Sequence, residues 1–160
     1  MDKEEKLLEL KKYRDLLLAT LDYYLDNKLV ELKTLDFDPS EHLRSLKDQT
    51  EDHFRKGRLT MLKNWFRDMT EIFLENGDLK FNAYLREKTS YEIDIFDSYY
   101  QRVDKIIAKR RITTDRQFYE INQMVDQLCQ TEPVDTQKIT TLNKLLADYE
   151  ARKTKKKILS

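Results

Sequence analysis

Apolar residues recur every three or four positions along most of the chain, which is the spacing of one face of an α-helix. The first run follows Asp2, and Glu5 three residues later completes a typical helix start, so we predict a helix from about residue 3. Extra apolar residues make the apolar stripe of this helix broader than the seam of a two-stranded coiled coil, so the helix is expected to contact more than one neighbour. Its stripe consists of Leu10, Tyr13, Leu17, Leu21, Tyr24, Leu25, Leu29 and Leu32, widened by Leu16, Leu18 and Tyr23.

A second helix is predicted from the segment Asp38-Pro39-Ser40-Glu41, which supplies an N-cap acceptor, a proline where no donor is needed and an acid in the first turn. The helix is expected to end at Asn76-Gly77, where the glycine provides a left-handed cap. Gly57 interrupts it and marks a kink, a close helix crossing or a tolerated weakness. The stripe is Leu43, Leu46, Phe54, Met61, Leu62, Trp65, Phe66, Met69, Ile72 and Phe73.

Three further helices are predicted after Gly77. Asp78 caps a third helix that meets no breaker before Thr113 and would be about 50 Å long. Thr114 with Gln117 predicts the start of a fourth, shorter helix, and Asp135 caps a fifth after Pro133. Their apolar stripes are Phe81, Leu85, Ile93, Phe96, Tyr100, Val103 and Ile107; Phe118, Ile121, Met124, Val125 and Leu128; and Ile139, Leu142, Leu145, Leu146 and Tyr149.

The short connections between these segments favour antiparallel neighbours. The sequence therefore predicts an all-α fold: an elongated antiparallel bundle of four to five helices, with three long helices and a C-terminal helical hairpin. No repeat or linker divides the chain, so residues 1–152 are expected to form a single domain. Residues 153–160 are expected to form a basic, frayed tail.

Composition supports this prediction and narrows the function. The 160 residues include 38% charged side chains but only two Gly and two Pro, which excludes turn-rich sandwiches, barrels and glycine-cradled nucleotide folds. The single Cys129 cannot form an intramolecular disulfide, and the first residues lack the order of an export signal, so a cytoplasmic location is expected. The longest apolar run, residues 16–21, is too short to span a membrane, and no membrane partner is expected.

Candidate catalytic and metal-binding groups do not gather into a known pattern. His42 and His53 are about 16 Å apart on one helix and lack the Glu-x-x-His spacing of di-metal bundles, so no metal, cofactor or catalytic residue is assigned. Cys129 is predicted to be a buried, inert thiol beside Leu128. Acidic pairs at helical spacing are interpreted as solvated faces: Asp22 and Asp26; Glu71 and Glu75; Glu92, Asp94 and Asp97.

Paired aromatic residues and charge clusters leave two binding hypotheses open. Adjacent rings on a helix diverge by about 100°, so one ring of each pair can lie at the rim and form a contact surface. The chain has equal numbers of acidic and basic side chains, but residues 1–38 carry a formal charge of −3 and residues 135–160 carry +4. The ring pairs are Tyr23-Tyr24, Trp65-Phe66, Tyr99-Tyr100 and Phe118-Tyr119, and the basic clusters are Lys105, Lys109, Arg110 and Arg111, and Lys153 with Lys155, Lys156 and Lys157.

The leading hypothesis is a non-enzymatic helical interaction or scaffold protein that self-associates as a homo-oligomer, or binds a protein partner, through rim residues. The alternative is a nucleic-acid-associated accessory protein, in which the two basic clusters join into one surface. An enzyme with a site between helices is the third hypothesis, because such a site needs no local motif.

Overall fold

The computed structural model describes residues 1–30 and 32–159. These residues form seven α-helices and no strand, which confirms the predicted all-α class. The prediction of four to five helices is wrong, because two of the expected long helices are each divided in two. The chain groups into two compact units, Met1–Asp94 (unit 1) and Ile95–Ser160 (unit 2).

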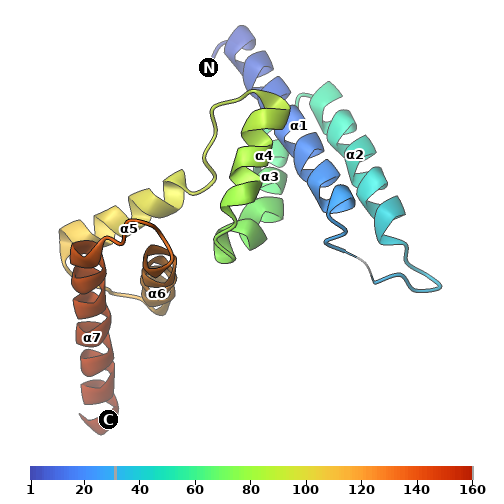
Figure 1. The fold of residues 1–160 in the computed structure, drawn as a ribbon. Coiled ribbons are helices and arrows are strands. Elements are labelled where there is room, and N and C mark those ends of the chain that lie inside the picture. The colour runs from blue at the N-terminus through green and yellow to red at the C-terminus, as the bar shows by residue number, and fades with distance from the viewer. Residues whose placement is uncertain (31, 160) are drawn as a thin grey trace. The chain divides into compact units, whose positions relative to one another are not determined.

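Unit 1 is built around α1 (Lys3–Asp26), which contacts α2 (Pro39–Arg55), α3 (Leu59–Glu75) and α4 (Leu79–Thr89). The arrangement of α1 beside α2 can be followed in Figure 1. Leu16, Leu17 and Leu21 of α1 are completely buried, as are Leu62 of α3 and Leu85 of α4. The wide apolar stripe of α1 therefore packs against several neighbours, as the sequence predicts.

An aromatic cluster joins α1, α3 and α4. The rings of Phe73 and Phe81 stack with their centroids 3.9 Å apart, and the Tyr23 ring contacts both edge-on at 5.5 and 5.1 Å. The Tyr24 hydroxyl donates a hydrogen bond of 2.8 Å to the Met69 carbonyl. Aromatic pairs of this geometry stabilise a core beyond their buried area, by about 0.5–1.5 kcal/mol each.

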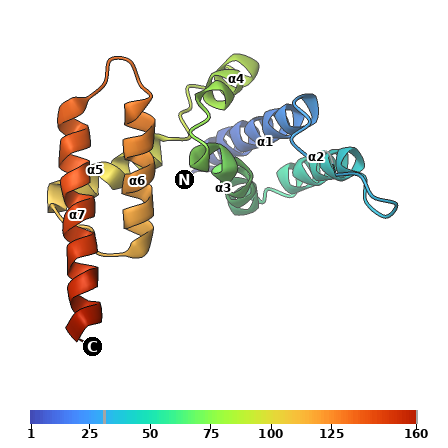
Figure 2. The same ribbon diagram turned by 60° about the horizontal axis from the view of Figure 1, so that its bottom comes forward.

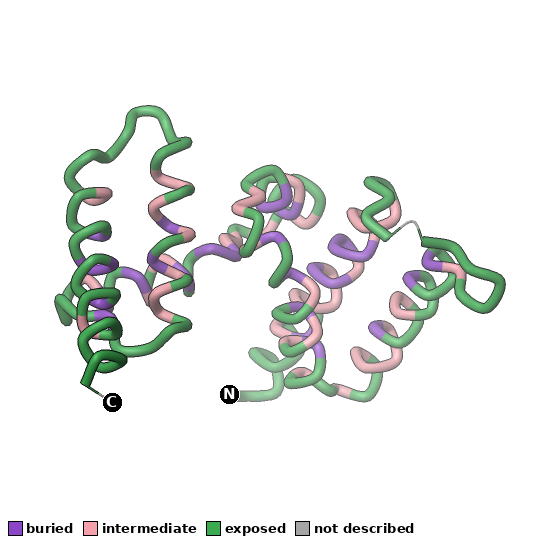
Figure 3. Tube along the Cα trace, turned by 90° about the horizontal axis from the view of Figure 1, so that it is seen from below, coloured by how far each residue is buried: buried purple, intermediate pink, exposed green. Residues whose placement is uncertain are grey.

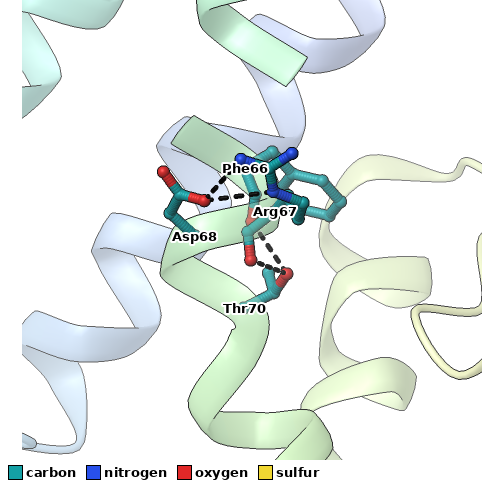
Figure 4. A network of polar contacts seen from close by, with 4 residues as sticks. All are labelled: Phe66, Arg67, Asp68 and Thr70. Carbon is teal, nitrogen blue, oxygen red and sulfur yellow. Dashed lines mark hydrogen bonds and ion pairs between the residues drawn. The ribbon is translucent and has the colours of Figure 1, made fainter. Parts of the chain in front are cut away.

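Buried threonine hydroxyls in unit 1 find their partners within their own helices. Thr70 of α3 donates to the Phe66 carbonyl at 2.7 Å and lies 3.2 Å from the Arg67 carbonyl, while Arg67 pairs with Asp68 on the helix surface (Figure 4). Thr20 of α1 donates to the carbonyl four residues earlier in the same way. These bonds allow a hydroxyl to be buried in an apolar core without an unpaired donor.

Gly57 separates two helices where the sequence predicts one. It has φ of +65°, its N–H donates to the Phe54 carbonyl, and the N–H of Arg58 donates to the His53 carbonyl. This is the pattern of a Schellman cap, and Gly77 ends α3 with the same pair of bonds. The prediction of one continuous helix through Gly57 is therefore wrong. The periodic apolar residues on either side of Gly57 belong to two separate helices, α2 and α3.

Replacing Gly57 by alanine is expected to destabilise unit 1 by about 1 kcal/mol, because a Cβ is strained at this left-handed φ. No heavy atom lies within 4 Å of the added Cβ, so the loss arises from the backbone and not from a clash. Gly57→Asn is the control, since asparagine tolerates this conformation better. Denaturant unfolding measures both, and an equal loss in the two variants would contradict the explanation.

The predicted long helix from Asp78 is divided between the two units. Helix α4 ends at Thr89 with Ser90 in a left-handed conformation, and α5 begins at Asp97. Side chains of α4 bind the intervening extended segment: Arg86 donates to the Ile93 carbonyl at 2.7 Å. These bonds between α4 and the segment take the place of helical ones, which local sequence patterns do not reveal.

The first helix also ends earlier than predicted. Helix α1 stops at Asp26, so Leu29 and Leu32 lie in the connection to α2 and not on the helical stripe. Their side chains are 47% and 79% exposed. The connection therefore presents apolar residues outside the core.

Unit 2 contains α5 (Asp97–Lys109), α6 (Asp115–Cys129) and α7 (Thr136–Leu159). Helices α6 and α7 lie side by side and antiparallel, as Figure 2 shows, and α5 contacts α6. Buried positions recur at intervals along α6 and α7 (Figure 3). The core of unit 2 consists of Tyr99, Val103, Ile106, Ile112, Ile121, Met124, Leu142, Leu145, Leu146 and Tyr149.

Most predicted helix starts are present with the expected capping bonds. Asp2 and Glu5 form a capping box, and the Asp38, Asp78 and Asp135 carboxylates each accept a hydrogen bond from a first-turn N–H. The Thr114 hydroxyl accepts from the N–H of Gln117, but the Gln117 side chain bonds Thr113 in place of the N-cap backbone. In the predicted tail, residues 153–159 continue α7 as a helix.

Candidate anion-binding surface

The antiparallel course of α6 brings two basic clusters of unit 2 together. Arg110 and Arg111 follow the end of α5, and the lysines of α7 lie more than forty residues later in the chain, yet both groups line the same hollows. We call this site the basic surface. It consists of Arg110, Arg111, Thr113, Arg152, Lys153, Lys155 and Lys156.

Two adjoining hollows form the basic surface. One, of about 450 Å³, is lined by Arg110, Asp148 and Ala151, and the other, of about 590 Å³, by Thr113, Tyr149 and other residues. Arg111, Arg152 and Lys155 line both hollows. The surface is thus a continuous shallow depression with cations on both sides, which suits an extended anion better than an enclosed small ligand.

Arg152 holds the two clusters in register. Its guanidinium donates at 2.9 Å to the carbonyl of Ile112, in the connection between α5 and α6, and also bonds the carbonyl of Asp148 at 3.3 Å. The Ile112 side chain is fully buried, which fixes the carbonyl that Arg152 contacts. Because a guanidinium is always charged in proteins, Arg152 both positions the surface and adds to its positive potential.

Asp115, the first residue of α6, holds α7 from the other side. Its carboxylate accepts from Lys153 Nζ at 2.6 Å and from the Tyr149 hydroxyl at 2.5 Å. The Lys153 ammonium and the Arg152 guanidinium also lie 5.6 Å from the centroid of the Tyr149 ring. Lys153 is therefore partly neutralised and acts mainly as a structural cation, while Lys155 and Lys156 are exposed to solvent.

This cluster predicts a pH dependence of unit 2 stability. The hydrogen bond from Lys153 lowers the pKa of Asp115 below its ordinary 3.8, and the hydrogen bond to Asp115 raises the pKa of Tyr149 and of Lys153 above 10.0 and 10.5. The Asp115 contribution is present above pH 3.8 and lost as pH falls through the lowered value. Those of Tyr149 and Lys153 are lost as pH rises through their raised values.

Asp115→Asn is expected to flatten both limbs of this pH profile, because it removes the carboxylate on which all three pKa shifts depend. Thermal unfolding followed by circular dichroism between about pH 3 and 11 measures the profile. Asp104→Asn, on an exposed carboxylate of α5, serves as the control. An unchanged profile in Asp115→Asn would show that the cluster does not form.

Arg110 occupies a strained position at the edge of the basic surface. It ends α5 in a left-handed conformation with φ of 57°, which glycine usually adopts at this place in a helix cap. Retaining a side chain there costs on the order of 1 kcal/mol. The strain places an extra cation beside α7, and backbone strain of this kind is concentrated at functional sites.

Arg110→Gly is therefore expected to stabilise unit 2 by about 0.5 kcal/mol, after allowing for the added freedom of glycine in the unfolded chain. Arg110→Ala removes the same charge but keeps the strain, so it is expected to give no stabilisation. Thermal unfolding of the two variants measures the difference. Equal stability of the two would show that the left-handed cap is not strained.

The remaining cations of the basic surface are not neutralised. Within residues 1–30 and 32–159, no carboxylate forms an ion pair with Arg110, Arg111, Lys155 or Lys156. The sequence of unit 2 carries 13 basic and 9 acidic side chains, a formal charge of +4, whereas unit 1 carries −4. The zero net charge of the chain therefore conceals one unit with a net positive charge and one with a net negative charge.

The structure separates some residues that the sequence placed together. Lys105 and Lys109 of α5 line a different hollow of about 340 Å³ with Thr114 and Arg116. Glu120 lies in this hollow and pairs with Arg102 at 3.0 Å, so part of its positive charge is compensated. Sequence reasoning missed Thr113 and Arg152 in the basic surface and Tyr149 in the lining of its wider hollow, because only the folded chain brings these residues beside Arg111.

Other candidate residues have structural roles or stand apart. Cys129 is exposed at the end of α6, so the prediction of a buried thiol is wrong: the last turn of α6 extends past the core. The His53 ring packs edge-on against Trp65 at 4.8 Å, and the His42 ring lies 5.5 Å from that of Phe37. Asp22 pairs with Lys47 at 2.6 Å.

In the part of the chain that the structure describes, no group of three or more histidine, cysteine, aspartate or glutamate side chains is placed to hold a metal ion. None of the described helices is long and apolar enough to cross a membrane. The chain matches no protein-family model, no curated protein and no solved structure.

Proposed function

We propose that the protein is a non-catalytic, nucleic-acid-associated accessory protein that binds a phosphate backbone through the basic surface of unit 2. The observation that carries the proposal is the convergence of Arg110 and Arg111 with Lys155 and Lys156 without a carboxylate partner within the described residues. Phosphate contacts from arginine and lysine supply most of the affinity in sequence-independent binding.

The open shape of the basic surface suits a ligand with regularly spaced negative charges, such as a phosphate backbone. Its cations lie along an open depression and come from one helix and one connection, so successive phosphates can each meet a different side chain. Thr113 adds a hydroxyl donor, and backbone-directed contacts commonly use such groups. Two carboxylates lie at the surface: Asp148 lines the first hollow, and Asp115 binds Lys153.

Salt dependence tests the proposal. Fluorescence anisotropy of a labelled single-stranded oligonucleotide would be titrated with the whole protein at several sodium chloride concentrations. Four phosphate contacts predict about a fiftyfold loss of affinity between roughly 50 and 200 mM salt. No binding at the lower concentration, or binding that is independent of salt, would contradict the proposal.

A second candidate function, association with a protein partner or a second copy, is favoured by the connection between α1 and α2. Exposed apolar residues are concentrated there, and Leu35 is fully exposed. On the helix rims, by contrast, Tyr119 is the only exposed ring of the four adjacent pairs within the described residues. The exposed residues of the connection are Leu29, Val30, Leu32, Leu35 and Phe37.

Light scattering at several concentrations tests this second candidate. Association through the connection predicts a mass above the 19.4 kDa of one chain, and Leu32→Asp with Leu35→Asp is expected to restore the single-chain mass. The control is Leu79→Asp with Met61→Asp, at exposed apolar positions on α4 and α3. A single-chain mass at all concentrations would contradict self-association.

A further inference from the structure

An exposed aromatic ring lies beside the basic surface. Tyr119 of α6 is 69% exposed, and it is the only large exposed aromatic side chain on a helix among the described residues. It lies four residues after Asp115, so both side chains project from the same face of α6, about 6 Å apart along the helix axis. Asp115 in turn binds Lys153 at 2.6 Å.

A second set of contacts links Tyr119 to α7. The Phe118 ring lies 5.8 Å from the Tyr119 ring and 5.5 Å from the Tyr149 ring, so the three rings form a row from the surface to the core. The pKa of Lys153 is raised mainly by its hydrogen bond to Asp115, and the Tyr119 hydroxyl contributes a smaller increase. Phe118 and Asp115 thus link the part of α6 that carries Tyr119 to Tyr149 and Lys153 of α7.

The combination of an exposed ring with unpaired cations distinguishes between nucleic-acid forms. A base stacks on a tyrosine ring only when it is not already stacked within a duplex, and such stacking tolerates any base. The α7 cations, residues 152–156, span only about 6 Å along the helix axis, which limits the surface to a few neighbouring phosphates. A flexible single strand can bring its phosphates and one base to this small area.

We infer that the basic surface binds single-stranded nucleic acid with one unpaired base stacked on the Tyr119 ring. This inference rests on the proposed function and adds the class of nucleic acid that is bound. Phosphates contact Arg110, Arg111, Lys155 and Lys156, and the base extends from them across α6. The Phe118 ring contacts the Tyr119 ring edge-on at 5.8 Å and leaves it exposed for a base to stack on.

The experiment compares three probes: a fluorescently labelled single-stranded DNA of twelve nucleotides, the duplex of the same sequence, and vesicles containing one-third phosphatidylserine. Tyr119→Ala is expected to weaken single-strand binding by about tenfold and to leave duplex binding unchanged. Tyr119→Phe keeps the ring and is expected to bind as the natural protein does. Val134→Ala, at an exposed apolar position before α7, is the matched control.

The salt slope provides a second readout that separates stacking from phosphate contact. Tyr119→Ala is expected to keep the slope, because stacking releases no counterions, whereas loss of a cation lowers it. Unchanged single-strand affinity in Tyr119→Ala, or equal binding of duplex and single strand, overturns the inference but leaves the proposed function standing. Binding of the vesicles alone, or of no probe, overturns both.

Discussion

Replacing Arg111, Lys155 and Lys156 together by alanine is expected to lower the affinity for single-stranded DNA on the order of a hundredfold at about 50 mM salt. The three side chains contribute to both hollows or to the wider one, and no carboxylate in the described part of the chain forms an ion pair with them. Their loss removes three phosphate contacts without uncovering a buried charge. The slope of affinity against salt is expected to fall by about 2.

The control must remove the same charge elsewhere. Arg44, Lys80 and Lys88 are exposed in unit 1, so their joint replacement by alanine changes the net charge equally. Anisotropy titrations of the two triple variants then show whether affinity depends on where the cations lie or only on the net charge of the protein. A similar loss in both would show that binding depends on net charge and not on the basic surface.

The second large effect is expected at the aromatic cluster of unit 1. Phe81→Ala removes a completely buried ring that stacks on Phe73 and contacts Tyr23, and is expected to destabilise unit 1 by about 3–5 kcal/mol. Leu79→Ala, two residues earlier on α4 and 62% exposed, is the control and should cost little. A small effect of Phe81→Ala would show that the cluster is not packed as described.

The same variant tests whether the chain unfolds as one domain or as two. Trp65 is the only tryptophan and lies in α3, so its fluorescence reports unit 1, while circular dichroism reports the helices of both units. In Phe81→Ala, the fluorescence transition is expected to come first and part of the helical signal to persist. Coincident transitions would support the single domain predicted from the sequence for residues 1–152.

Local signals in the sequence were sufficient for the helix starts that have a side-chain cap, but not for those of α3 and α5, which have none. The acceptors at Asp2, Asp38, Asp78 and Asp135 each act within three residues, and all four form the expected bonds. Gly77 was also interpreted correctly, because the apolar period stops there. These features need no knowledge of the rest of the fold.

The breaks within apolar runs could not be predicted in the same way. Across Gly57 the three-to-four spacing continues, although the glycine ends α2 with the same cap that Gly77 forms. Between Thr89 and Asp97 there is neither glycine nor proline, and the extended segment is held by α4, through Arg86 and the Ile93 carbonyl. Such contacts override local helix preference but leave no pattern in the sequence.

Only part of the basic surface could be predicted from the sequence. The sequence shows the clusters at Arg110 and at Lys155, and their union was one of two open hypotheses. What joins them is the antiparallel packing of α6 on α7 and the bond from Arg152 to the Ile112 carbonyl. The exposed Tyr119 ring was recognised only as half of an aromatic pair, because helix periodicity does not fix which ring of a pair is covered.

The opposite formal charges of the two units also govern how the protein behaves at high concentration. A molecule with no net charge lacks the mutual repulsion that keeps copies apart, and acidic and basic regions on different copies attract each other in dilute buffer. Added electrolyte screens this attraction and improves solubility, but it also weakens contacts to phosphate. The solutions in which the proposed nucleic-acid binding would be strongest are therefore those in which the protein is expected to be least soluble.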